Sequence, residues 1–145
     1  MKVGIIGLGT VGEGVLKVLT LEKENIKIKS NCELEVKYAC DLNIDRQFSF
    51  DFDKNILITD YNKIINDPEV DIVIELIGGE TLAKTIILDA FRAKKNVVTA
   101  NKALIAKHGV ELFQVAKENN VAFLFEAAVG GGIPIITPLI ESLVA

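Results

Sequence analysis

The sequence has little of what redox centres, metal sites and nucleic-acid interfaces require. Its 145 residues include two cysteines, one histidine, one methionine and no tryptophan. Cys32 and Cys40 form no CxxC pair and have no histidine cluster nearby, so we expect no zinc or iron site. Two cysteines without such a pattern are typical of reduced thiols in a cytoplasmic protein.

Basic charge and long hydrophobic runs are also lacking. The net charge is −4, whereas a nucleic-acid-binding domain usually has a basic surface. No apolar stretch approaches the about 20 residues of a membrane span. Met1 leads directly into a strand pattern, without the cleavage region of a signal peptide. We therefore expect a cytoplasmic protein that binds a small molecule, with no nucleic-acid or membrane partner.

Hydrophobic residues make up half of the chain, and strand patterns alternate with helix patterns. This alternation predicts an α/β fold, a doubly wound parallel sheet of the Rossmann type, over residues 1–132. Strands are expected at residues 2–6, 33–40, 56–59, 71–77, 96–100 and 121–125, with a small edge strand through Phe48, Phe50 and Phe52. Helices are expected at residues 11–24, 60–66, 81–95, 101–107 and 110–119, the last two separated by Gly109.

Residues 133–145, "IPIITPLIESLVA", are predicted to begin an apolar helix. An apolar helix needs further protein to pack against, so we expect the sequence to be part of a longer chain. This helix would lead into a further domain.

The unusual residues follow the predicted strands. In a doubly wound sheet, ligands bind outside the carboxyl ends of the strands. Three glycine-rich stretches, an acid and a lysine come at these ends: residues 7–12 (GLGTVG), Asp41, residues 78–79 (GG), residues 101–102 (NK) and residues 126–132 (EAAVGGG). Because parallel strands end at one edge of the sheet, the sequence predicts one ligand site there.

The first of these stretches has the GxGxxG spacing of a dinucleotide-binding turn. Gly7 allows the tight turn, Gly9 lets the backbone approach a pyrophosphate, and Gly12 lets the helix pack closely on the strand. The amide groups at the helix N-terminus complete an anion site. Such a turn is also found as a purely structural feature, but its place after the first strand favours NAD or NADP binding.

Asp41 is the candidate ligand for the adenosine ribose. It lies 29 residues after Gly12, further than the usual spacing of about 20, because residues 23–31 lengthen the connection. A carboxylate repels a 2′-phosphate, so Asp41 favours NAD over NADP, whereas Arg46 would weaken that preference if its loop folded back. The alternative is that Asp41 is a solvated turn residue.

Lys102 is the candidate catalytic residue. Most lysines are surface groups, yet this one directly follows a predicted strand within "VVTANKALIA". An ammonium beside a nicotinamide can polarise a carbonyl oxygen and exchange a proton with it. His108, the only histidine, is expected to lie at a helix C-terminus before Gly109 rather than to act in catalysis.

Four motifs closely resemble homoserine dehydrogenase and run in order along nearly the whole chain: GIIGLGTVGEGV, DIVIELIGGETLA, VVTANKALIAKHG and FEAAVGGGIPII. The family interconverts L-aspartate 4-semialdehyde and L-homoserine with NAD or NADP, on the route to threonine, methionine and isoleucine. The resemblance implies a homo-oligomeric full-length enzyme, in which residues 133–145 lead into a substrate-binding and dimerisation domain. It also implies that a second lysine and the substrate-binding acids lie outside this chain.

The resemblance also assigns residues to two sites. Lys102 is the implied catalytic residue, and the cofactor-binding residues are Gly7, Leu8, Gly9, Thr10, Val11, Gly12, Asp41, Ile77, Gly78, Thr99 and Lys102. In this family, backbone carbonyls hold a monovalent cation, usually sodium; the matching residues are Glu126, Val129, Gly131 and Ile133. A flexible linker is the other interpretation of this glycine-rich segment.

Two alternatives remain open from the sequence. Aspartate dehydrogenases and dihydrodipicolinate reductases share the first glycine motif, but "TANKALIAKHG" is not expected in them. A non-catalytic nucleotide-sensing module fits the short chain, but such a module needs neither Lys102 nor the second glycine-rich segment.

Overall fold

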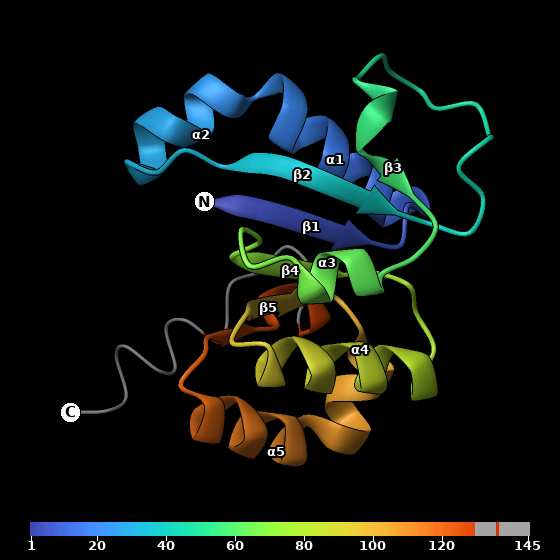
Figure 1. Cartoon of the computed structure of the whole chain (residues 1–145). Helices are drawn as coiled ribbons and strands as arrows, with labels where there is room; N and C mark the ends of the chain where they lie inside the picture. The colour runs from blue at the N-terminus through green and yellow to red at the C-terminus, as the bar shows by residue number, and fades with distance from the viewer. Residues whose placement is uncertain (130–135, 137–145) are drawn as a thin grey trace.

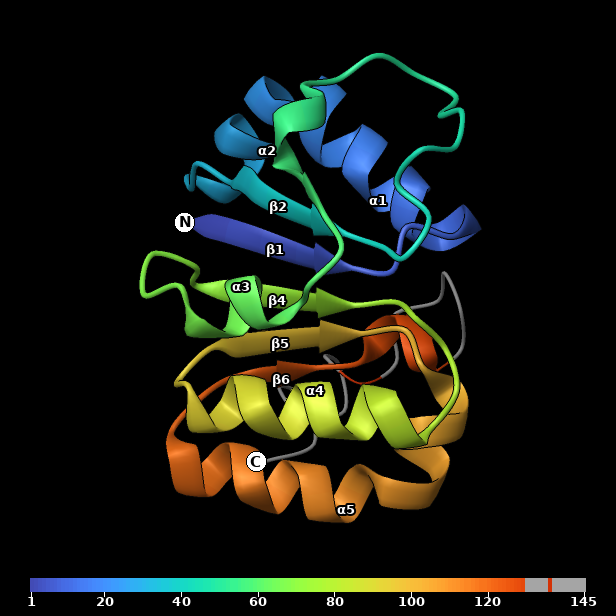
Figure 2. The same ribbon diagram turned by 45° about the vertical axis from the view of Figure 1, so that its right-hand side comes forward.

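The fold was analysed in a computed structural model that describes residues 1–129 and residue 136. Within these residues, six strands form one sheet in the order β3-β2-β1-β4-β5-β6, and every neighbouring pair is parallel. All strands therefore end at the same edge, as Figure 2 shows by the direction of the arrowheads. The strands are β1 (Lys2–Ile6), β2 (Glu35–Cys40), β3 (Leu57–Ile58), β4 (Ile72–Glu75), β5 (Asn96–Thr99) and β6 (Phe123–Leu124).

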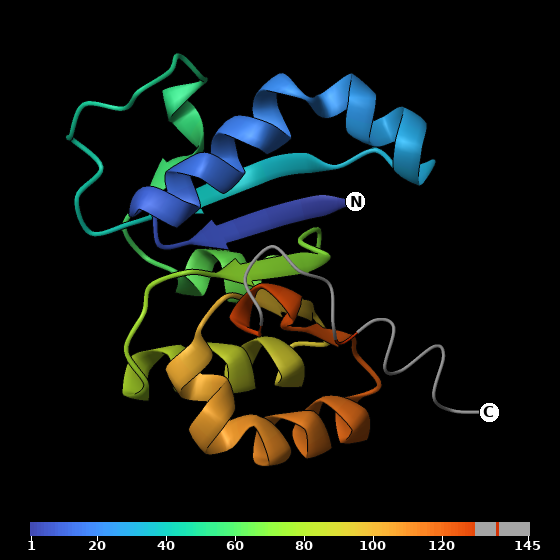
Figure 3. The ribbon, with the colours of Figure 1, turned by 180° about the vertical axis from the view of Figure 1, so that it is seen from behind.

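Helices connect these strands and cover both faces of the sheet (Figure 1). α1 and α2 lie over β1 and β2 on one face (Figure 3), whereas α3, α4 and α5 cover the other. The helices are α1 (Thr10–Leu21), α2 (Lys23–Ser30), α3 (Asn62–Asn66), α4 (Thr81–Arg92) and α5 (Lys102–Asn119), with short 3₁₀ turns η1 (Lys54–Ile56) and η2 (Glu126–Ala128). This arrangement confirms the doubly wound α/β fold.

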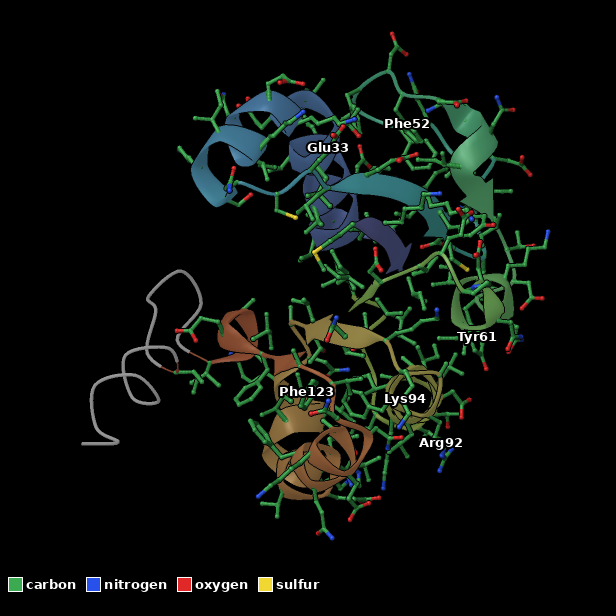
Figure 4. All side chains as sticks on the ribbon, turned by 60° about the vertical axis from the view of Figure 1, so that its left-hand side comes forward. Glu33, Phe52, Tyr61, Arg92, Lys94 and Phe123 are labelled. Atoms are coloured by element: carbon green, nitrogen blue, oxygen red, sulfur yellow. The ribbon has the colours of Figure 1, made fainter. Side chains whose placement is uncertain are left out.

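Two hydrophobic cores follow from the alternation of side chains along the strands. Val3 and Ile5 of β1 point to the α1 face and pack with Leu16. Ile6 belongs to the core on the opposite face, where Phe91 of α4 is fully buried. Phe123 of β6 (Figure 4) belongs to the same core, with its ring centroid 5.2 Å from that of Phe91. The central strands are thus buried on both faces, as a parallel sheet requires.

The first differences from the sequence predictions concern α1 and the loop after β2. The first helix ends at Leu21, and a second helix, α2, follows without any buried residue. Phe48, Phe50 and Phe52 form no strand; their rings cluster at centroid distances of 5.0 Å and pack against the α1-side core. The alternating phenylalanines therefore pack against the core from a loop, without pairing as a strand.

The predicted break at Gly109 is also wrong. α5 runs without interruption from Lys102 to Asn119, and Gly109 and His108 lie inside it. One glycine costs a helix about 1 kcal/mol, which is less than the packing of Leu104, Leu112 and Ala116 on the core provides. A single glycine therefore does not end this helix.

Residues 133–145 were predicted to begin an apolar helix; apart from Ile136, they lie outside the described residues. Among the helices that the structure does describe, none has the length and apolarity needed to cross a membrane.

Candidate functional site

The glycine loop between β1 and α1 has the geometry of an anion site. Gly7 has φ of +97°, a conformation that side chains disfavour. A Cβ at position 12 would lie 1.8 Å from the Gly7 carbonyl oxygen, so only glycine fits where α1 begins. A Cβ at position 9, in contrast, would meet nothing within 4 Å. The loop therefore leaves open space above Gly9, beside the first turn of α1.

Two cavities meet at this loop, near the point where the strand order reverses between β1 and β4. Their volumes are about 600 and 610 Å³. Gly9 and Asp41 line both cavities. The first is otherwise lined by Leu8, Thr10, Glu13, Gly14, Lys17, Asn43, Arg46 and Ser49, and the second by Ile6, Gly7, Cys40, Leu42, Thr59, Asp60, Tyr61, Leu76, Ile77, Gly78, Leu82 and Ile86.

Asp41 is more than a solvated turn residue. It follows β2, and its carboxylate accepts the Leu8 N–H at Oδ2 (2.6 Å) and the Asn43 N–H at Oδ1 (3.0 Å). It therefore ties the end of β2 to the glycine loop. A carboxylate oxygen accepts more than one hydrogen bond, so both oxygens retain capacity for the hydroxyl groups of a ligand in the adjoining cavities.

Arg46 lies in the first cavity, because the loop after β2 folds back onto α1. Its guanidinium donates to the Leu8 carbonyl oxygen, pairs with Glu13 (2.8 Å) and lies 4.3 Å from the Phe48 ring centroid. The Ser49 N–H donates to Glu13 (2.6 Å). Hydrogen bonds from Ser49 and then from Arg46 lower the pKa of Glu13 to about 2. Sequence reasoning considered Arg46 but missed Glu13, since an acid near a helix start is commonplace.

The loop after β4 also contributes to the site. Gly78 and Gly79 both have φ of +71°, which explains the pair of glycines. Ile77 and Gly78 line the second cavity with Leu82. Leu82 of α4 is apolar, yet it is 52% exposed. Its place beside the cavity is the reason an apolar residue occurs there.

Glu75, at the end of β4, is fully buried and was not identified from the sequence. Its Oε1 accepts the Ile77 N–H (2.9 Å), and its Oε2 accepts the Thr99 hydroxyl (2.7 Å). Burial raises the pKa of Glu75, although hydrogen bonds from Thr99, Ile77 and Gly78 oppose this shift. An acid inside the otherwise apolar run DIVIELI was the available signal.

Thr99 is the last residue of β5, whereas Lys102 comes after this strand, at the start of α5. The Thr99 side chain is fully buried behind the cavities, and its Oγ1 accepts the Asn101 N–H (3.0 Å). Asn101 caps α5, because its Oδ1 accepts the Leu104 N–H (3.1 Å). Lys102 is the first residue of α5 and is exposed. Its ammonium forms no hydrogen bond or ion pair with the part of the chain that the structure describes.

His108 was expected at a helix C-terminus, but it lies inside α5 and faces α4. Its Nδ1 is 3.4 Å from Lys84 Nζ and 3.7 Å from the Glu111 carboxylate. A third cavity of about 460 Å³ lies beside it. Neither Lys102 nor the glycine loop lines this cavity, so His108 is separate from the strand-end site.

The segment after β6 is described only in part. Glu126 begins η2, and its carbonyl oxygen accepts the Val129 N–H (3.0 Å) while its Oε1 accepts the Ile136 N–H (2.9 Å). Gly131 and Ile133 lie outside the described residues. Val11, another predicted cofactor residue, is 58% exposed and lines neither strand-end cavity.

Comparison with known proteins identifies the family of this chain. A family model described as the NAD-binding domain of homoserine dehydrogenase matches residues 7–126. The chain belongs to the homoserine dehydrogenase family. It is 43% identical to the homoserine dehydrogenase of Bacillus subtilis over 99% of its length, and 44% identical to that of Pseudomonas aeruginosa over its full length. It spans about a third of the length of both relatives.

A solved structure supports the same assignment. The crystal structure of a homoserine dehydrogenase from Thiobacillus denitrificans is 42% identical and superposes with a TM-score of 0.86, covering 99% of this chain and 33% of that one. The matched family model spans the glycine loop, Asp41, Glu75 and Lys102. This chain is thus the NAD(P)-binding, Rossmann-type portion of the homoserine dehydrogenase family.

The residues present fit a dinucleotide. The open space above Gly9 and the free amides at the start of α1 suit a pyrophosphate. Asp41 and both cavities adjoin that point, and the second cavity extends from the end of β2 to the loop after β4. This place, beside the strand-order reversal, is where doubly wound sheets bind dinucleotides.

Proposed function

We propose that this chain is the cofactor-binding part of an enzyme that interconverts L-homoserine and L-aspartate 4-semialdehyde with NAD or NADP. This activity belongs to the biosynthesis of threonine, methionine and isoleucine in the cytoplasm. The observation that carries the proposal is the glycine loop, with its open space above Gly9 at the meeting point of two cavities. Family membership supplies the substrate class.

The adenosine half of the cofactor binds over β1 and β2. The Gly9 to Gly12 amides hold the pyrophosphate, and Asp41, which accepts the Leu8 N–H, also accepts hydrogen bonds from the adenosine ribose. Asp41 carries the preference for NAD over NADP, because its carboxylate repels a 2′-phosphate. Arg46 opposes that preference, but its guanidinium is already bound to Glu13 and the Leu8 carbonyl oxygen.

The nicotinamide half binds over β4 and β5, beside Ile77, Gly78 and the start of α5. The chemistry that this cofactor supplies when bound is hydride transfer. Lys102 exchanges a proton with the substrate oxygen and stabilises the negative charge that develops there. Its exposed position agrees with this role, because the substrate arrives from the portion of the enzyme that relatives have in addition to this third.

A monovalent cation, sodium, is proposed to be bound by the backbone carbonyl oxygens of Glu126, Val129, Gly131 and Ile133. Carbonyl oxygens are hard ligands that suit such an ion. The full-length enzyme is proposed to be a homo-oligomer.

Calorimetric titration of NAD and NADP against the purified chain tests the proposal. We expect the chain to bind a dinucleotide but not to oxidise homoserine, because it spans only a third of its relatives. The full-length protein should oxidise homoserine. Failure of the chain to bind either cofactor contradicts the proposal; binding without turnover in the full-length protein indicates a nucleotide sensor instead.

A further inference from the structure

Two loops of the site are joined by one buried carboxylate. Glu75 ends β4 with no exposed surface, and it accepts hydrogen bonds from two directions. One comes from Ile77 N–H (2.9 Å) in the loop after β4, and the Gly78 N–H adds to it. The other comes from the Thr99 hydroxyl (2.7 Å) at the end of β5.

The same network continues to the residue before Lys102. Thr99 Oγ1 accepts the Asn101 N–H (3.0 Å), so one hydroxyl both donates to Glu75 and accepts from the next loop. The Asn101 side chain then donates from Nδ2 to the Gly79 carbonyl oxygen (2.5 Å) and caps α5 with Oδ1. Hydrogen bonds through Glu75, Thr99 and Asn101 therefore join the loop after β4 to the start of α5.

These bonds matter because the loop itself is permissive. Gly78 and Gly79 have φ of +71° and no side chain that packs, so free glycine backbone would lose much conformational entropy on binding a ligand. Fixing the loop before the ligand arrives removes that cost from binding. A buried carboxylate that accepts hydrogen bonds from both loops can hold them in place, because a donor left without a partner in the interior costs free energy.

The network is confined to one half of the site. Glu75 and Thr99 lie on β4 and β5, whereas Asp41 and the glycine loop belong to β1 and β2. The two halves of a dinucleotide-binding sheet each hold one nucleotide. Disturbing the network should therefore affect the nicotinamide nucleotide and spare the adenosine nucleotide.

We propose that Glu75 and Thr99 are positioning residues for the nicotinamide half of the cofactor. They hold the Ile77–Gly79 backbone and the Asn101–Lys102 helix start in the arrangement that receives this nucleotide. The inference rests on the proposed function, since it deepens the same cofactor site. It assigns to these residues a role through other groups rather than contact with the reacting atoms.

Thr99→Val and Thr99→Ser give a matched test in the purified chain. Valine keeps the shape of threonine but removes the hydroxyl, whereas serine keeps the hydroxyl. Binding of NADH and of ADP is measured by calorimetry, and NADH fluorescence reports on the nicotinamide environment. We expect Thr99→Val to weaken NADH binding about tenfold and ADP binding less than about twofold, while Thr99→Ser restores NADH affinity.

Two further variants protect the test against misfolding. Asn101→Asp keeps the helix-capping oxygen but loses the donor to Gly79, and it should also weaken NADH selectively. Lys95→Met removes a buried ammonium group at the opposite end of β5. This ammonium donates to the Asp67 and Val70 carbonyl oxygens. This variant should lower stability without changing the ratio of the two affinities.

The outcomes separate the inference from the function on which it rests. Equal losses of NADH and ADP affinity, or unchanged NADH affinity in both Thr99→Val and Asn101→Asp, overturn the positioning role while leaving cofactor binding intact. Absence of NADH and ADP binding by the unmutated chain overturns the proposed function, and with it this inference. Selective loss of NADH affinity with rescue by serine supports the role.

Discussion

The Arg46 guanidinium lies 2.8 Å from the Glu13 carboxylate and joins the loop after β2 to the first turn of α1. The Arg46 side chain also donates to the Leu8 carbonyl oxygen in the glycine loop. The loop after β2 thus contacts both the glycine loop and the start of α1, which follow one another in the sequence, at the adenosine side of the site. This contact leads to the first prediction.

Acid should weaken the attachment of this loop. The pKa of Glu13 is lowered to about 2 by Ser49 and Arg46, so the ionised carboxylate is stabilising. That contribution is fully present above the pKa of an unfolded glutamate, about 4.3, and is lost as the pH falls toward 2. Thermal melts should therefore show that Glu13→Gln lowers the melting temperature near neutral pH, and progressively less below about pH 4.

Glu24→Gln is the control, because Glu24 is exposed on α2, away from both strand-end cavities. A Glu13→Gln effect that is independent of pH would show that the carboxylate charge is unimportant.

The second prediction concerns cofactor preference. The unmutated chain should bind NAD more tightly than NADP, and Asp41→Ala should weaken NAD binding by about 0.5–1.5 kcal/mol for each lost ribose hydrogen bond. Asp41→Asn removes the charge but keeps an oxygen for Leu8 N–H, so it should narrow the gap between the cofactors. Calorimetric titration of both cofactors measures this, with exposed Asp45→Asn in the same loop as control.

Equal or tighter binding of NADP by the unmutated chain would contradict the second prediction. Arg46 would then be the residue that accepts the 2′-phosphate, at the expense of its bond to Glu13.

The third prediction contrasts two glycines of one loop. Gly9→Val should leave the melting temperature nearly unchanged, since a Cβ there meets nothing within 4 Å, but it should abolish dinucleotide binding by filling the pyrophosphate space. Gly12→Ala should instead destabilise the fold by about 1–3 kcal/mol, because its Cβ would lie 1.8 Å from the Gly7 oxygen. Thermal melts and NAD titrations distinguish them; unchanged affinity in Gly9→Val would mean that the loop is structural.

The fourth prediction tests Lys102 in a full-length homoserine dehydrogenase whose cofactor-binding third is this chain. Lys102→Ala should reduce kcat by about 10²–10⁴-fold, with little change in cofactor affinity or stability, because the side chain is exposed. Lys102→Arg keeps the charge without a readily transferable proton, so it separates electrostatic stabilisation from proton transfer. Near-normal kcat in a folded Lys102→Ala enzyme would identify Lys102 as a surface lysine.

The fifth prediction follows from the uninterrupted course of α5. Gly109→Ala should raise the free energy of unfolding by up to about 1 kcal/mol, because Gly109 is helical and a Cβ there makes only an ordinary contact, 3.5 Å from Ile105 Cγ2. Denaturant titration measures the change, and NAD affinity should stay constant. A loss of stability would show that the helix bends at this position.

Much of the fold could be predicted because it is encoded in short-range patterns. Apolar runs between glycines and polar turns marked β1 and β4, and the GxGxxG spacing placed the first ligand loop. Parallel strands end at a common edge, so this alone brought Gly9, Asp41 and Lys102 to the same side of the sheet. The boundaries were less accurate: the strand expected at residues 71–77 spans only Ile72–Glu75.

Other features of the site and the cores depend on contacts between residues that are distant in the sequence. The alternation of Phe48, Phe50 and Phe52 is typical of a strand, but these residues form a loop whose rings pack against the α1-side core. Glu75 looked like one polar residue in an apolar run until β5 placed the Thr99 hydroxyl beside it, 24 positions along the chain. The sequence by itself thus determined the fold class and the edge of the sheet that holds the site. Only folding determined which groups meet there, because hydrogen bonds and burial depend on partners distant in sequence.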